Sequence, residues 1–182
     1  MRISLTGVSG VGKSSVVREL VCKYGFKFLT TTTTRPIRKK EIPDIDFYFV
    51  TKPTFEQMIE QSLLAEYIFQ LDHYYGLSKQ ELDSNSHLNC VLNLEPYQGI
   101  KEKIPNTVWV LLHHDDKEEI KRRILARDSN LSEQAVKTRL DYIESYNPDI
   151  NLYDLLINVT GKSVQEVTAE LMLRLSEIDK IE

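Results

Sequence analysis

The first fourteen residues, MRISLTGVSGVGKS, contain the residue types that bind a chain of phosphates. A G-x-x-x-x-G-K-S spacing runs from Gly7 to Ser14, after a short apolar run and before a helix-forming segment over residues 14–24. Glycines let the backbone turn so that several N–H groups face an anion, and Lys13 adds a positive charge beside the outer phosphates. The helix points its positive N-terminus at the same anion, and the Ser14 hydroxyl is placed to bind Mg²⁺.

This stretch predicts a phosphate-binding loop between a strand and a helix. A glycine-rich turn without a ligand is the competing interpretation, and the strand and helix patterns on either side favour phosphate binding. The residues expected to hold the phosphates are Gly7, Ser9, Gly10, Val11, Gly12, Lys13, Ser14 and Ser15.

A basic stretch follows a run of threonines at residues 30–34. It begins at Arg35 and includes Arg38, and Pro36 and Pro43 disfavour a regular helix, so the stretch is predicted to be a loop. Arginine suits phosphate because its planar guanidinium makes two parallel hydrogen bonds to one anion. A solvated surface loop without a ligand is the alternative.

The elements that must position these residues alternate along the chain. Near-continuous apolar runs at residues 90–94 and 108–112 indicate parallel strands covered on both faces. Strands alternate with helices at both ends, which predicts an α/β fold, a P-loop NTPase-type parallel sheet flanked by helices. Two insertions interrupt this core. Residues 35–88 have short strands and helices of their own, and residues 115–146 have a helical pattern rich in arginine.

Local signals predict some boundaries within this plan. Residues 26–29 are expected to start a strand that continues into the threonines, because β-branched residues suit strands. Capping pairs three residues apart predict helix starts at Thr54, Ser78 and Ser163. Ser132 is expected to cap a helix in the second insertion.

Composition excludes several classes of protein. The chain has 182 residues, 41% hydrophobic and 27% charged, as is ordinary for a single soluble domain. The net charge of −4 argues against broad binding to nucleic acid or a membrane surface, so an anionic ligand needs a local group of cations. No apolar run approaches the roughly 18 residues of a membrane span. The first strand begins at residue 2, which predicts a cytoplasmic protein without a signal peptide. The two cysteines and four histidines lack metal-ligand spacing.

Taken together, these motifs resemble those of the guanylate kinase family of P-loop nucleoside monophosphate kinases. The loop that begins at Gly7 matches the family's G-P-S-G-x-G-K-[ST] except for Val8. The segment TTRPIR, with Arg35 and Arg38, is similar to the family's T-T-R-x-P-R, whose arginines hold the acceptor phosphate. Thr31 stands where the family has a serine that contacts this phosphate. The resemblance spans essentially the whole chain.

The resemblance also implies residues for the two nucleotides. Glu66 stands where a family glutamate accepts hydrogen bonds from guanine N1 and N2, and Tyr75 where a tyrosine contacts the phosphate. Asn158 stands where the family borders the adenine of ATP. The family's arginines that reach over the ATP phosphates correspond to Arg123, Arg127 and Arg139.

Several positions of the implied acceptor site depart from the family pattern. Phe47 replaces a phosphate-binding tyrosine, and Leu77 replaces the serine or threonine that donates to guanine O6. The Ser78 hydroxyl or a backbone N–H could donate in its place. The family's D-x-D-x-Q-G becomes NLEPYQG, in which Asn93 is a weaker partner for magnesium than aspartate and Glu95 could compensate.

The resemblance implies a single domain made of a core (residues 1–34, 89–114 and 147–182), an acceptor-binding lobe (35–88) and a lid region (115–146). The expected reaction moves the γ-phosphoryl group of ATP, with Mg²⁺, to the phosphate of GMP or dGMP. The residues expected to act on the transferred group are Lys13, Arg35, Arg123, Arg127 and Arg139. The expected partners are ATP and a nucleoside monophosphate, without nucleic acid or membrane, in a monomer or homodimer.

Two alternatives to this function stay open at the level of sequence. The acceptor could be another nucleoside monophosphate or a ribose phosphate, because Leu77 and Asn93 break the guanine pattern. The chain could also be a non-catalytic binding module related to these kinases, although Gly12, Lys13 and Ser14 of the phosphate loop are intact.

Overall fold

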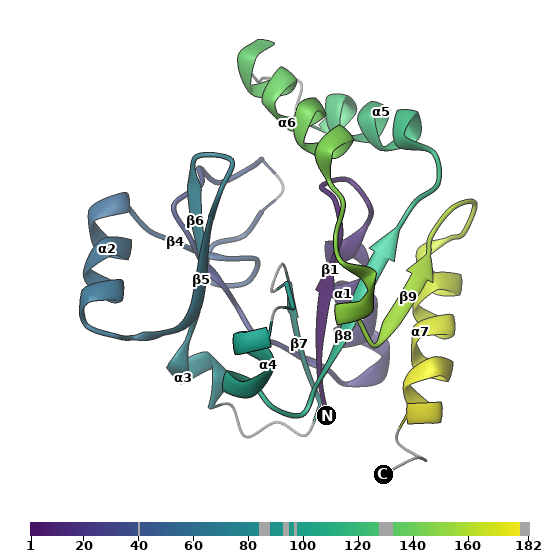
Figure 1. Cartoon of the computed structure of the whole chain (residues 1–182), viewed down its shortest axis with the longest axis horizontal. Helices are drawn as coiled ribbons and strands as arrows, with labels where there is room; N and C mark the ends of the chain where they lie inside the picture. Colours follow the sequence, from purple (N-terminus) through teal and green to yellow (C-terminus); the bar gives the residue numbers. More distant parts are fainter. Residues whose placement is uncertain (40, 84–87, 93–94, 97, 128–132, 179–182) are drawn as a thin grey trace.

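A computed structural model of the chain contains two β-sheets that lie side by side, with a pair of helices above them (Figure 1). The structure describes residues 1–39, 41–83, 88–92, 95–96, 98–127 and 133–178. Within this described part, no helix is long and apolar enough to cross a membrane.

The central sheet has five strands in the order β2-β7-β1-β8-β9, and all of its neighbours are parallel. Its strands are β1 (Arg2–Thr6), β2 (Lys27–Phe28), β7 (Asn89–Leu92), β8 (Thr107–His113) and β9 (Leu155–Asn158). The α/β class with a parallel central sheet, predicted from the apolar runs, is confirmed. Since all strands run the same way, the turn after β1 and the ends of β8 and β9 meet at one edge of the sheet.

Helices cover both faces of this sheet. Helices α1 (Lys13–Tyr24) and α7 (Val164–Ile178) pack on the face that carries Ile3, Leu5 and Val110. Helix α4 (Gln98–Lys103) and the residue after it place Ile100 and Ile104 on the opposite face, in a second apolar cluster with Val91, Trp109, Leu29 and Leu77. Alternate residues of β7 and β8 therefore enter different cores, which explains why these strands are apolar on both faces.

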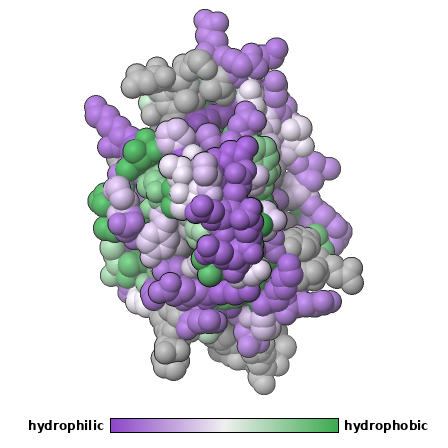
Figure 2. Space-filling model, turned by 90° about the vertical axis from the view of Figure 1, so that its left-hand side faces the viewer, coloured by the Kyte–Doolittle hydropathy of each residue, from purple (hydrophilic) through white to green (hydrophobic). Residues whose placement is uncertain are grey.

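The second sheet has four strands in the order β4-β3-β6-β5. Its strands are β3 (Thr32–Thr33), β4 (Tyr48–Phe49), β5 (Leu64–Gln70) and β6 (His73–Ser78), with helices α2 (Lys52–Glu60) and α3 (Lys79–Leu82) beside them. Helix α2 covers the outer side of this sheet, where Figure 2 shows mainly hydrophilic side chains with hydrophobic ones gathered at one edge.

The prediction of one strand from Phe26 into the threonines is wrong, because the chain changes sheets there. Leu29 makes the last hydrogen bond to the central sheet, from its N–H to the Cys90 carbonyl (2.8 Å). The threonines then pair with β6, and the Thr33 hydroxyl donates to the Tyr74 carbonyl (2.9 Å). The run of β-branched residues therefore links the central sheet to the second one.

Helices α5 (Lys117–Arg127) and α6 (Glu133–Ser145) lie beyond the carboxyl end of β8 (Figure 1). Lys121 of α5 pairs with Glu144 of α6 (2.7 Å), which holds the two helices together. A short 3₁₀ helix, Ile150–Leu152, follows and leads the chain back to β9. The predicted cap at Ser132 lies outside the described residues.

The capping predictions have mixed outcomes. Ser78 accepts a hydrogen bond from Glu81 N–H, and Ser163 accepts one from Glu166 N–H, as expected. Helix α2, however, begins one turn earlier than predicted: Thr51 is its cap and accepts from Thr54 N–H (3.3 Å). The reason is Pro53, which suits the first turn of a helix because it has no N–H to satisfy.

We expect Thr51→Ala to lower the melting temperature by about 2–4 °C, because losing a cap costs about 1 kcal/mol. Thr54→Ala should have a smaller effect, since its backbone N–H still meets Thr51. Thermal unfolding followed by circular dichroism measures both. A larger loss for Thr54→Ala than for Thr51→Ala would contradict this helix start.

Candidate nucleotide-binding site

The phosphate loop sits against the end of β8 and the start of the lid helices. Gly7 has a φ of 133°, and a Cβ there would lie 2.3 Å from the Leu112 carbonyl oxygen. Gly10 has a φ of 86°, and a Cβ there would lie 3.1 Å from Ile124 of α5. Only glycine tolerates these positions, so the turn is held by its neighbours as well as by its own sequence.

Lys13 lies in the first turn of α1 and folds back over the loop. Its ammonium donates to the carbonyls of Gly7 (2.6 Å) and Val8 (3.1 Å). Ser14 and Ser15 are exposed beside it, whereas the Val11 side chain is buried in the core and leaves only backbone groups to face a ligand. The loop thus presents one cation and two hydroxyls at a helix N-terminus, which is an arrangement suited to phosphate.

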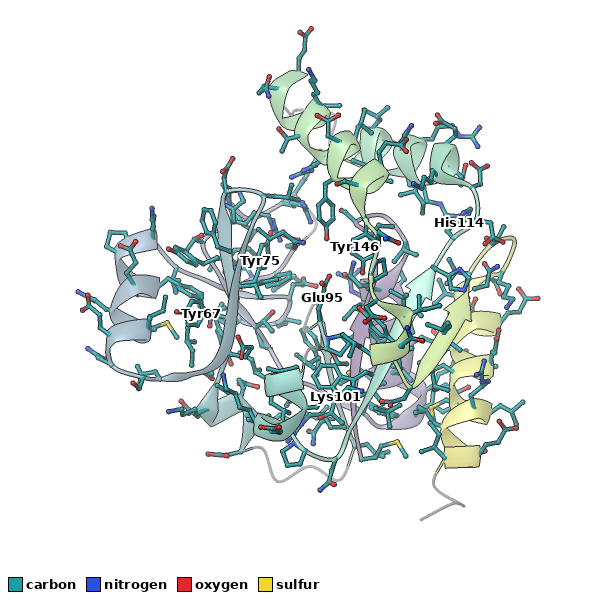
Figure 3. All side chains as sticks on the ribbon, viewed as in Figure 1. Tyr67, Tyr75, Glu95, Lys101, His114 and Tyr146 are labelled. Atoms are coloured by element: carbon teal, nitrogen blue, oxygen red, sulfur yellow. The ribbon has the colours of Figure 1, made fainter. Side chains whose placement is uncertain are left out.

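Glu95 lies close to this loop, in a cage of tyrosines. Tyr146 donates its hydroxyl to a Glu95 carboxylate oxygen (3.5 Å), and Figure 3 shows the two side chains near the middle of the molecule. Burial raises the pKa of Glu95, while Lys13 and Tyr146 act in the opposite direction. Burial together with the Glu95 charge also raises the pKa values of Tyr146 and Tyr142. The sequence did not reveal these tyrosines as partners of Glu95, because they come from the end of α6 and the residue after it, about 50 residues further along the chain. Asn93 lies outside the described residues.

Arg35 and Arg38 share a single carboxylate partner, Glu41. The Arg35 side chain is 4% exposed and makes a two-pronged contact with Glu41, at 3.0 and 2.8 Å. Glu41 also accepts from the Arg38 N–H (2.8 Å) and lies 3.6 Å from its guanidinium. The pairing resembles the geometry with which arginine holds a phosphate. Sequence reasoning missed Glu41, although it lies three residues after Arg38 in the same basic loop.

Phe47 supports Arg35 through its ring. The Arg35 guanidinium carbon lies 5.3 Å from the centre of the Phe47 ring and 5.7 Å from that of Phe49, within the range of a cation–π contact. Tyr75 meets the Phe47 ring edge-on, with the ring centres 6.3 Å apart. The Phe47 ring, which lacks the hydroxyl of the family's tyrosine, therefore contacts Arg35 through its face alone.

The β5–β6 hairpin has two different faces. Glu66 lies opposite Leu77, and Ile68 lies opposite Tyr75, so all four side chains share one face. Tyr67 belongs to the other face and packs on Phe55 of α2, with ring centres 6.3 Å apart. Figure 3 shows Tyr67 toward α2 and Tyr75 on the side of Glu95 and Tyr146. The structure thus brings Glu66, Tyr75 and Leu77 together on the face toward the central sheet.

Two predicted hydroxyls of this site have different surroundings. The Thr31 side chain is buried, and its hydroxyl has no hydrogen-bond partner within the described part of the chain. A buried hydroxyl left without a partner costs about 1–3 kcal/mol, which a bound ligand could recover. The Ser78 hydroxyl caps α3 instead, and its position next to Leu77 puts it on the other face of the hairpin.

His73 lies at the tip of this hairpin among positive charges, a placement that the sequence did not indicate. Burial lowers the pKa of His73, and the charges of Arg35, Arg139 and Arg38 act in the same direction, against Asp72. An arginine of α6 therefore approaches the same point as the two arginines of the basic loop. Near the hairpin tip Gln70 also donates to the Tyr142 hydroxyl of α6 (2.5 Å), so the hairpin and the lid helix are in contact.

The remaining predicted residues lie around the donor side. Arg123 is exposed on α5 and pairs with Glu119 (3.0 Å), and the side chain of Arg127 lies outside what the structure describes. Asn158 ends β9 and donates to the Asp115 carboxylate (2.7 Å), while its own oxygen accepts from Thr160 N–H (2.9 Å). Asn158 therefore ties β9 to the start of the lid rather than standing alone at the surface.

The oxygen donors near the loop fit a magnesium ion that is shared with phosphates. The described residues contain no group of three or more histidine, cysteine, aspartate or glutamate side chains that could enclose a metal. Ser14 and Glu95 are the hard oxygen donors close to Lys13. Magnesium commonly takes one or two protein oxygens and completes its shell with water and phosphate.

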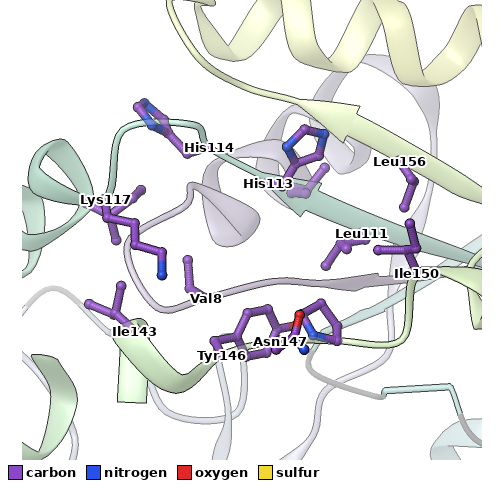
Figure 4. A pocket seen from close by; sticks show the side chains of 13 residues that line it. Val8, Leu111, His113, His114, Lys117, Ile143, Tyr146, Asn147, Ile150 and Leu156 are labelled. Atoms are coloured by element: carbon purple, nitrogen blue, oxygen red, sulfur yellow. The ribbon is translucent and has the colours of Figure 1, made fainter. Parts of the chain in front are cut away.

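A cavity of about 310 Å³ lies behind the loop, between the base of α5 and α6 and the ends of β8 and β9. Figure 4 shows Val8, Lys117 and Tyr146 around it, with His113 and Leu156 on the sheet side. None of the predicted nucleotide-binding residues lines it. It separates the base of the lid helices from the central sheet.

A parallel sheet, a phosphate loop after its first strand, a second sheet with an arginine pair and a pair of helices beyond β8 define a P-loop kinase-like α/β protein. The sequence model of the guanylate kinase family matches residues 2–177. The chain therefore belongs to the guanylate kinase family, as its motifs suggested.

Individual relatives agree with this assignment. The chain is 25% identical to a guanylate kinase of Clostridium acetobutylicum, over 98% of this chain and 88% of the relative. It is 30% identical to a guanylate kinase of Streptococcus mutans, over 76% and 69% of the two chains. In fold it is similar to the crystal structure of guanylate kinase from Anaplasma phagocytophilum, with a TM-score of 0.70 and 19% identity over 97% and 85% of the chains.

The shared carboxylate gives a prediction for Glu41. Glu41→Gln leaves Arg35 buried with a neutral partner, which should lower the free energy of unfolding by about 1–3 kcal/mol. Inorganic phosphate should then raise the melting temperature of Glu41→Gln more than that of the wild type, because it supplies the missing negative charge. Glu60→Gln, on the exposed face of α2, is the control. Equal shifts in all three proteins would contradict a phosphate-binding role for this arginine pair.

The raised pKa of Glu95 gives a prediction about pH. Between its ordinary pKa and its higher pKa in the folded protein, the folded state binds more protons, so wild-type stability falls as pH rises through that window. Glu95→Gln should therefore melt at a higher temperature than the wild type at pH 7, because the variant has no carboxylate to desolvate. The difference should vanish near pH 4. Thermal melts between pH 4 and 8 measure it, and a variant that is less stable at pH 7 would contradict this reading.

Proposed function

We propose that this chain transfers the γ-phosphoryl group of ATP to the phosphate of GMP or dGMP. Membership of the guanylate kinase family supports the reaction class. The choice of acceptor is supported by the face of the β5–β6 hairpin that Glu66 and Tyr75 share. On this face the Glu66 carboxylate can bind a base, and the arginines near His73 at the hairpin tip can bind a phosphate. The intact phosphate loop favours catalysis over binding alone.

The acceptor lies between the second sheet and the central sheet in this proposal. Arg35 and Arg38 hold its phosphate, with Tyr75 and the Thr31 hydroxyl as further donors. Phe47 keeps Arg35 in place through its ring. Because guanine N1 and N2 are donors, the Glu66 carboxylate, which offers only acceptors, favours guanine over adenine. Residues 35–88 thus act as the acceptor lobe.

The donor lies on the phosphate loop. Lys13 exchanges its bonds to the Gly7 and Val8 carbonyls for bonds to the β- and γ-phosphates of ATP. The Ser14 hydroxyl would hold Mg²⁺, which would supply positive charge against the same phosphates, and the Glu95 carboxylate would assist through water. Asn158 borders the adenine. Residues 115–146 act as the lid, and Arg123, Arg127 and Arg139 face the transferred group.

The chemical step needs alignment more than a strong base, because the acceptor phosphate is already a nucleophile. An oxygen of that phosphate attacks the γ-phosphorus, and the bond from phosphorus to the bridging oxygen of ADP breaks. The arginines neutralise the charge that spreads over the equatorial oxygens. The acceptor lobe and the lid must meet around the phosphates to exclude water, which would otherwise hydrolyse ATP.

A coupled assay for ADP formation tests this proposal. We expect GMP and dGMP to give higher kcat/KM than AMP, CMP and UMP. Lys13→Ala should lower kcat by about 10²–10³-fold, the loss found when other preorganised charge-stabilising groups are removed, without changing the melting curve. Glu66→Ala should remove the preference for guanine while the phosphate contacts remain.

Lys23→Ala is the matched control, because Lys23 lies at the exposed end of the same helix and pairs with Glu19. It should retain wild-type activity. Turnover in Lys13→Ala equal to that of Lys23→Ala would refute the donor site. Equal use of GMP and AMP by the wild type would refute the acceptor assignment alone.

A further inference from the structure

The base-reading part of the site lacks a donor on the hairpin. Leu77 is 1% exposed and packs with Ile100, Ile104 and Trp109 in the cluster under α4. Its side chain has no polar atom. Ser78 points to the opposite face and caps α3. A guanine beside Glu66 would therefore have its O6 acceptor without a side-chain partner from β6, and a buried acceptor without a partner weakens binding.

A cation from another element stands next to Glu66. Lys103, at the end of α4, places its ammonium 3.3 Å from the Glu66 carboxylate. The Glu66 side chain is 11% exposed and the Lys103 side chain 58% exposed, so the lysine can follow a ligand while the glutamate is held. The pair lines one side of a cavity of about 600 Å³, whose other walls come from the end of α2, from β5 and from α3 (Ile59, Ser62, Leu64, Ala65, Tyr67, Lys79 and Leu82).

We infer that Lys103 is the donor to guanine O6 in this chain and takes the place of the hydroxyl that Leu77 lacks. This inference rests on the proposed function, and it names a specificity-determining residue within the acceptor site. The same segment carries both features: Ile100 of α4 and Ile104 just after it share an apolar cluster with Leu77, and Lys103 meets Glu66. The apolar residue on β6 and the cation on α4 are therefore parts of one contact between the hairpin and the core.

The chemistry of the pair matches one edge of guanine. Guanine presents an acceptor, O6, beside two donors, N1–H and N2–H. An ammonium has donors only, and a carboxylate has acceptors only, so together they offer the complementary pattern. Adenine presents the reverse pattern at these two places, with an amino donor at N6 and an acceptor at N1. The pair therefore favours guanine and disfavours adenine at both contacts.

The test replaces Lys103 by methionine, which has a side chain of similar length but no hydrogen-bond donor. We expect Lys103→Met to lower kcat/KM for GMP by about 10–100-fold, as expected for a lost hydrogen bond to a charged group. The KM for ATP should not change. Turnover of 6-thio-GMP, whose sulfur accepts a hydrogen bond poorly, should fall much less. Lys103→Arg should keep most of the preference for GMP over AMP.

Lys101→Met is the matched control, because Lys101 lies on the same helix and pairs with Asp154 instead (3.8 Å). It should behave as the wild type with every nucleotide, and melting curves show that the variants are folded. Equal loss with GMP and 6-thio-GMP would overturn the inference, since the role of Lys103 would then not be at O6. A gain in kcat/KM for GMP would also overturn it, because Lys103 would then only block Glu66.

The outcomes separate this inference from the proposed function. A wild type that prefers GMP, together with a Lys103→Met variant of unchanged kcat/KM, refutes the role of Lys103 and leaves the kinase activity standing. A wild type that does not turn over GMP refutes the proposed function and the inference with it.

Discussion

The close approach of the phosphate loop to its two neighbours is the constraint on which the rest of the site depends. Gly7 lies against the Leu112 carbonyl of β8, and Gly10 lies against Ile124 of α5. The loop is thereby fixed between the central sheet and the lid at the place where the parallel strands end. Lys13 gains its position from this seating, because it opens the helix that follows the loop. A change in the angle of α5 would therefore reach the loop through direct contact rather than through a flexible linker.

The charged groups of the site already have partners within the protein. Lys13 is held by two carbonyls, Arg35 by Glu41, and Glu66 by Lys103. A nucleotide would replace some of these bonds. The net free energy gained on binding is therefore smaller than that of the new contacts alone. This arrangement lets a chain of net charge −4 hold several cations in place for an anionic ligand. It also fixes the orientation of the buried Arg35 side chain before the ligand arrives.

The parts that the sequence predicted are those with local signals. The phosphate loop is a continuous motif, and the strands of the central sheet are long apolar runs, so both follow from residues that are close in the chain. The caps at Ser78 and Ser163 follow for the same reason. Two of the partners that sequence reasoning missed are set by tertiary contacts, Tyr146 on Glu95 and Lys103 on Glu66, whereas Glu41 lies only six residues from Arg35 in the same loop. No sequence pattern predicts that α4 ends beside β5, because Lys103 lies 37 positions after Glu66 in the chain.

The departures from the family pattern acquire a common physical meaning in the folded chain. Phe47 and Leu77 each replace a hydroxyl by apolar surface, and each is buried against a neighbour that carries or supports a cation. Phe47 lies under the guanidinium of Arg35, and Leu77 packs on the helix that carries Lys103. At both positions a hydroxyl that could bind the ligand is absent, and apolar packing positions a cation, Arg35 or Lys103, instead. A point charge is less directional than a hydroxyl, so acceptor recognition by the proposed site depends more on how firmly α4 and the basic loop are held. In the proposed function, the apolar cluster around Trp109 and the ring contacts of Phe47 serve substrate selection as well as stability.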